Sequence, residues 1–89
     1  MKKLYHFKWD CYRQGEVEGL FVEDEETISK NIGKDVIFGE ILGKHSDVFG
    51  TLGMEDLEVI DVSESFINEF QEKIGSFGYN PIEYIEDEV

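Results

Sequence analysis

The sequence predicts a single α+β domain, in which two helices cover one side of a mainly antiparallel sheet of about five strands, in the order ββαβββα. Three observations support this fold class. The chain has 89 residues, so residues 1–89 are enough for one domain and too few for two. Apolar and polar residues alternate in several short segments that are separated by glycine turns. Two other segments repeat their apolar residues at helical spacing, between residues suited to cap a helix.

The first two predicted strands form a hairpin. Over residues 4–13 the apolar and polar side chains alternate, as a half-buried strand requires. A turn around Gly15 is followed by the alternating segment 17–22, which gives the returning strand. Gly19 lies within that strand and is expected to mark a bulge. The face of the first strand expected to be buried carries Tyr5, Phe7, Trp9 and Cys11.

A short helix is predicted over residues 24–33, because its acidic start complements the helix dipole and Gly33 is suited to end it. A second hairpin follows, with strands at residues 35–42 and 45–52. Residues 57–62 alternate again and are expected to form the fifth strand.

The second helix is predicted between Ser63, a suitable N-cap, and Gly75, a suitable terminator. Its apolar residues fall on one stripe, so we expect this helix to cover the sheet. A last helical turn is expected at Asn80 and Pro81, which combine an N-cap with a proline at the first helical position. An acidic tail begins at about residue 86.

Composition limits the kinds of partner. The chain carries 21 acidic and 8 basic residues, a formal net charge of −13 at pH 7, and its 40% of hydrophobic residues indicate that it folds. This charge disfavours direct binding to nucleic acid or to anionic membranes, and no apolar segment approaches the roughly 20 residues that span a bilayer. A single cysteine, Cys11, excludes an internal disulfide, and no apolar leader follows the N-terminal lysines, so we expect a cytoplasmic protein.

The best candidate site is the segment 39–53, where four glycines surround Lys44, His45 and Ser46. The ammonium group supplies charge, the hydroxyl and the backbone supply donors, and the imidazole titrates near neutral pH, which together suit a small anion. The alternative is a polar hairpin turn in which the glycines serve only turns and bulges. The predicted ligand-binding residues are Tyr12, Arg13, Lys44, His45 and Ser46.

No catalytic residue, metal site or cofactor is predicted. Cys11 and His45 would have to converge from separate strands to form a nucleophile and its base, and a buried, unreactive thiol is the favoured alternative. One cysteine and two separated histidines lack the spacing of a zinc site. Trp9 is either a stacking surface near Arg13 or, because it shares a face with Phe7, part of the core.

Three segments resemble a small family of uncharacterised bacterial and phage proteins: residues 9–11 (WDC), 18–21 (EGLF) and 38–46 (FGEILGKHS). The resemblance covers most of the chain. The family has no assigned activity, so the resemblance transfers no functional residue to this sequence. It implies a phage or mobile-element origin and, with it, an accessory or anti-defence role.

These patterns favour a binding protein over an enzyme and leave two functions open. The first is a non-catalytic protein that holds a small anionic or nucleotide-like ligand at the tip formed by Lys44, His45 and Ser46. The second is an acidic inhibitor, or a decoy that imitates nucleic acid, which docks on a basic protein. The expected partner is therefore either a small anion or a basic protein.

Overall fold

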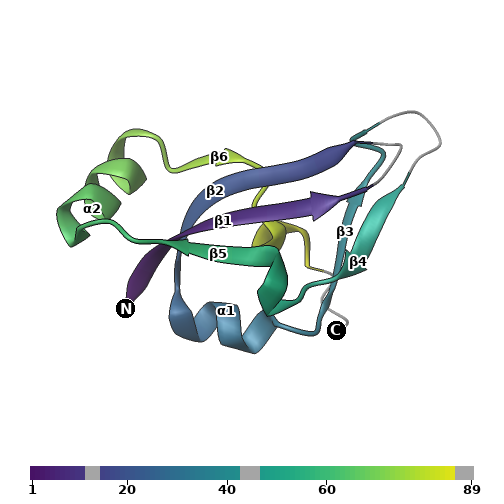
Figure 1. The fold of residues 1–89 in the computed structure, drawn as a ribbon, viewed down its shortest axis with the longest axis horizontal. Coiled ribbons are helices and arrows are strands. Elements are labelled where there is room, and N and C mark those ends of the chain that lie inside the picture. The colour runs from purple at the N-terminus through teal and green to yellow at the C-terminus, as the bar shows by residue number, and fades with distance from the viewer. Residues whose placement is uncertain (12–14, 43–46, 86–89) are drawn as a thin grey trace.

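The computed structural model describes residues 1–11, 15–42 and 47–85, and it confirms the α+β class (Figure 1). Within these residues every pair of neighbouring strands is antiparallel. The predicted acidic tail lies outside the described residues. None of the helices in the described segments is both long enough and apolar enough to cross a bilayer.

The main sheet has four strands in the order β5-β1-β2-β6. β1 (Lys2–Asp10) pairs along its whole length with β2 (Glu16–Asp24), which confirms the first hairpin. The other edge of β1 pairs with β5 (Leu57–Ile60), and β2 pairs with β6 (Ser76–Gly78). The sequence gives no sign of β6, because a strand of three residues is too short to show alternation and is defined by its pairing with β2.

The second predicted hairpin forms a sheet of its own, made of β3 (Asp35–Gly39) and β4 (Val48–Thr51). Its inward side chains, Val36, Phe38 and Val48, are buried in the same core as the large side chains of β1. The hairpin therefore covers the main sheet instead of extending it. The β3–β4 register shifts by one residue after Ile37, and Gly39 has a φ of 80°, so this glycine serves a bulge.

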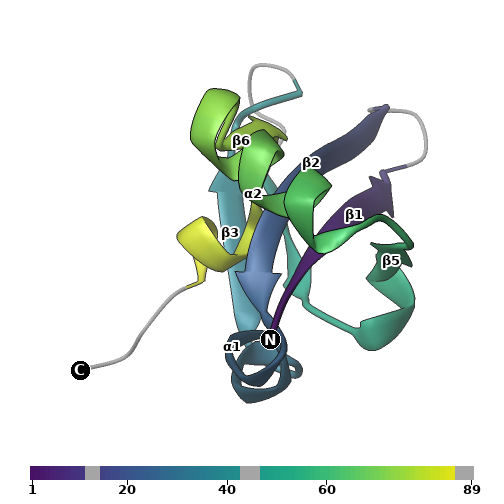
Figure 2. The same ribbon diagram turned by 90° about the vertical axis from the view of Figure 1, so that its left-hand side faces the viewer.

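The two helices pack into different cores. α1 (Glu25–Asn31) contributes Ile28 to the main core, whereas α2 (Glu64–Lys73) packs Ile67 and Phe70 in a second, smaller one. The helices lie apart from each other in Figure 2. The prediction that both helices cover one face of the sheet is wrong. Ile28 of α1 is in the core that contains Tyr5 and Phe7 of β1, whereas α2 packs with Leu4 on the other face of that strand. The main core contains Tyr5, Phe7, Val17, Phe21, Ile28, Val36, Phe38, Val48 and Leu52, and the second contains Leu4, Val22, Ile67 and Phe70.

The predicted helix starts are confirmed by their caps. The side chains of Asp24, Ser63 and Asn80 accept backbone N–H groups at the starts of α1, α2 and a 3-10 turn, η3 (Pro81–Tyr84). The hydrogen bond from the Glu26 backbone holds the pKa of the Asp24 carboxyl below its ordinary value. The sequence predicts these helix starts because each capping side chain bonds to a backbone group only two or three residues away.

Gly19 is not a bulge. The β1–β2 register is unbroken across the Phe7–Gly19 pair, and Gly19 faces Gly78 on β6. A Cβ atom at Gly19 would lie 2.5 Å from the backbone nitrogen of Tyr79 and closer still to its carbonyl oxygen. A Cβ atom at Gly78 would lie 2.5 Å from the carbonyl oxygen of Glu18. The two glycines are therefore needed for the close approach of β6 and the chain after it to β2.

Candidate functional site

The predicted ligand-binding residues, Tyr12, Arg13, Lys44, His45 and Ser46, all lie outside the described residues. The residues next to these segments are described. Cys11 precedes the first segment and Asp47 follows the second, and both line one cavity. Cys11 and Asp47 therefore lie at the same end of the molecule, where β1 ends and β4 begins (Figure 1).

This cavity is open and has a volume of about 710 Å³. It lies between the end of β1, the strand β4 and the 3-10 turn η2 (Met54–Asp56). Its wall combines four carboxylates from three separate parts of the chain with two aromatic side chains. We call this site the acidic groove, and define it by Trp9, Asp10, Asp47, Phe49, Glu55 and Asp56.

The described lining of the acidic groove contains no lysine, arginine or histidine. A neighbouring cavity of about 450 Å³ shares Asp10, Glu55 and Asp56 with the groove and adds His6 and Lys8. Both of these basic groups already face a carboxylate: the Lys8 ammonium lies 3.5 Å from Glu16, and the His6 ring lies 3.3 Å from Glu18. Among the described residues, the groove therefore has four carboxylates and no basic side chain in its wall.

The two aromatic residues of the groove differ in their surroundings. Trp9 is half-buried, with ring centroids 5.2 Å from Phe7 and 5.5 Å from Phe38, so it packs against the main core as its strand position suggested. Gly50 leaves room for it, because a Cβ atom there would lie 3.3 Å from the edge of the indole. Phe49, in contrast, is 70% exposed and stands opposite Ile37 on the outer face of the hairpin.

Cys11 does not have the surroundings of a nucleophile. Burial, and then the negative charge of Asp10, raise the pKa of the thiol. A reactive cysteine needs the opposite shift, because the thiolate is the attacking species. In the described part of the chain, no three of His, Cys, Asp and Glu are placed to hold a metal ion.

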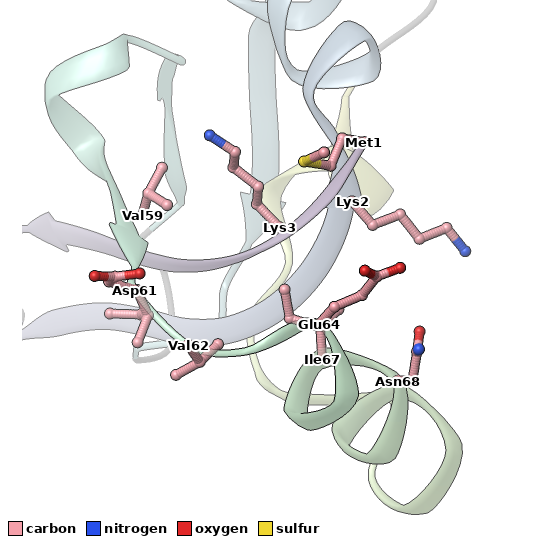
Figure 3. Close-up of a pocket in the computed structure, with 10 residues that line it drawn as sticks. Met1, Lys2, Lys3, Val59, Asp61, Val62, Glu64, Ile67 and Asn68 are labelled. Atoms are coloured by element: carbon pink, nitrogen blue, oxygen red, sulfur yellow. The ribbon is translucent and has the colours of Figure 1, made fainter.

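A second cavity, of about 550 Å³, lies between the start of β1, the end of β5 and α2 (Figure 3). Val59, Val62 and Ile67 contribute to its apolar wall. Figure 3 shows the ammonium groups of Lys2 and Lys3 directed to opposite sides, so they do not converge on one anion. Lys3 instead lies 2.9 Å from Glu25, and this contact raises the pKa of its ammonium group.

Comparison with known proteins gives no match to a family model, to a curated protein or to a solved structure. The function is therefore inferred from the geometry and charge of the site.

Proposed function

We propose that this protein is a non-catalytic binding protein that docks through its acidic groove on a basic segment of another protein. One observation carries the proposal: four carboxylates and two aromatic side chains surround one open cavity whose described lining has no basic residue. Carboxylates pair with ammonium and guanidinium groups, and aromatic faces attract the same cations. The described carboxylates of the wall would repel an anion.

The charge of the whole chain supports the same partner. A net charge of −13 speeds the encounter with a basic protein and slows the encounter with an acidic one. The anti-defence role implied by the resemblance to phage proteins is consistent with a decoy or inhibitor of this kind. The proposal therefore favours the basic protein over the small anion as the partner.

Neutralising two acids of the groove should weaken binding to a labelled poly-L-lysine by about three- to tenfold, since each exposed ion pair contributes modestly. The variant is Asp47→Asn with Glu55→Gln; Asp56 is left intact because its carboxylate accepts the backbone N–H of Gly53 at 2.9 Å. Fluorescence anisotropy at low salt, where surface charges are least screened, gives the dissociation constants.

The matched control for this experiment is Glu72→Gln with Glu83→Gln, which makes the same change of charge at exposed sites outside the cavities described above. The control variant should lose less affinity than the groove variant. Equal losses would mean that poly-L-lysine responds only to net charge, and the groove would no longer be supported as the binding site.

A second candidate function is the binding of a small anionic or nucleotide-like ligand by the segments that carry Arg13 and Lys44. The observation that favours it is that Cys11 and Asp47, which adjoin these segments, line the same cavity. Under this second function, the basic side chains of these segments offset the carboxylates of the cavity and hold an anion between them.

Under this second function, Lys44→Ala should abolish the rise in melting temperature that a nucleotide or metabolite produces. A ligand at about 100 times its dissociation constant stabilises a protein by about 2.7 kcal/mol, which is readily detected as a thermal shift. The control is Lys73→Ala, whose ammonium group lies 3.2 Å from Glu69 on α2. A ligand-induced shift that survives Lys44→Ala would contradict this function.

A further inference from the structure

β4 has one edge that faces the acidic groove. In the two-stranded sheet its only described neighbour is β3, on one side. On the other side the residues of β4, Val48–Thr51, line the groove together with Trp9. An edge strand without a neighbour presents backbone donors and acceptors on which a further strand can form.

The backbone groups that face the groove can be identified from the hydrogen bonds at the end of the hairpin. Leu52 donates its N–H to the carbonyl of Lys34 at 3.0 Å and accepts the N–H of Gly33 at 2.8 Å, so its backbone faces the β3 side. In an antiparallel ladder, residues that face the partner alternate with residues that face away. The N–H and C=O groups of Phe49 and Thr51 therefore point to the groove.

We propose that an extended basic peptide binds in the acidic groove by adding a strand to the free edge of β4. Its backbone bonds to Phe49 and Thr51, and every second side chain, a lysine or arginine, reaches the carboxylates of Asp47 and Glu55. This inference rests on the proposed function and adds how the partner is held. Main-chain hydrogen bonds supply affinity, and the side chains at every second position of the peptide, which point to the same face, supply specificity.

Charge complementarity selects this occupant. A second copy of the chain, paired edge to edge along β4, would bring two sets of groove carboxylates together and would be repelled. An acidic or neutral peptide would gain the backbone bonds without the ion pairs. A peptide with lysine at alternate positions forms both the backbone hydrogen bonds to β4 and the ion pairs to the groove carboxylates.

The test uses a short synthetic peptide in which lysine and threonine alternate, with blocked ends. Phe49→Ala removes the phenyl ring and keeps the outward N–H, whereas Phe49→Pro removes both. Because the Phe49 backbone faces away from β3, proline there leaves the β3–β4 ladder in place, as on other edge strands. Phe49→Pro should bind the peptide about three- to tenfold more weakly than Phe49→Ala, the effect of one lost hydrogen bond.

A second measurement does not depend on how the proline variant folds. Hydrogen exchange followed by NMR on the unaltered protein should slow at the amides of Phe49 and Thr51 when the peptide is added. The same peptide methylated on its backbone nitrogens, which keeps every charge, should not slow them.

The outcomes separate the binding mode from the proposed function. If the proline and alanine variants bind equally and these amides exchange as before, strand addition is overturned, while groove-dependent binding of poly-L-lysine would keep the proposed function. Loss of that groove dependence would overturn the function itself. Protection of the two amides without peptide, rising with protein concentration, would assign the edge to a second copy and also overturn the inference.

Discussion

Replacing Phe7 with alanine is expected to lower the free energy of unfolding by about 3–5 kcal/mol. Phe7 is 0% exposed at the centre of the main core, with its ring centroid 5.2 Å from that of Trp9 and 5.9 Å from that of Phe38. Removing the ring loses its burial and leaves a cavity that the surrounding strands fill only in part. Native domains are stable by about 5–15 kcal/mol in total, so this loss is a large fraction of the stability.

Urea denaturation followed by tryptophan fluorescence measures this loss. Phe49→Ala is the matched control, because Phe49 is the same residue type in a strand but is 70% exposed. Its stability should stay within about 0.5 kcal/mol of the unaltered protein. A loss below about 1 kcal/mol for Phe7→Ala would contradict the packing of the main core around this ring.

Replacing Gly19 with alanine should lower the free energy of unfolding by about 1–3 kcal/mol. The added Cβ atom meets the backbone of Tyr79 and not a movable side chain, so β6 and the residues after it must shift away from β2. The β2–β6 pairing should be weakened with it, because Gly19 and Gly78 are register partners.

Gly50→Ala is the control for this substitution. Its Cβ atom would lie 3.3 Å from the edge of the Trp9 ring, and a side chain gives way by a few tenths of an ångström more easily than backbone does. Urea denaturation should therefore show a smaller loss than for Gly19→Ala, and hydrogen exchange in β6 should be unaffected. Equal losses would contradict the close approach of β6 to β2.

The sequence predicts the elements whose signal is local. The first hairpin follows from alternation, and the starts of α1 and α2 follow from Asp24 and Ser63, which cap backbone groups two or three residues away. Three features escape this reasoning: β6, the separation of the second hairpin, and the opposite packing of α2. Each depends on which distant segment a residue meets, and a single sequence does not encode that in its periodicity.

The same limit applies to the candidate site. Glu55 and Asp56 are adjacent in the sequence, but their side chains give no sign of which distant residues they meet. In the folded chain these two acids share one cavity with Asp10 and Asp47. This arrangement depends on tertiary structure, because β1, β4 and η2 come together at one end of the molecule. The predicted ligand-binding cluster at Lys44 lies outside the described residues and stays a prediction.

β1 contributes to both hydrophobic cores of the molecule. Leu4 packs in the second core, and Tyr5 and Phe7 pack in the main core on the other face of the strand. At Leu4 and Tyr5, both faces of β1 are therefore buried. Under the proposed function, a partner would instead meet the edge of β4 beside the acidic groove, through main-chain groups and charge.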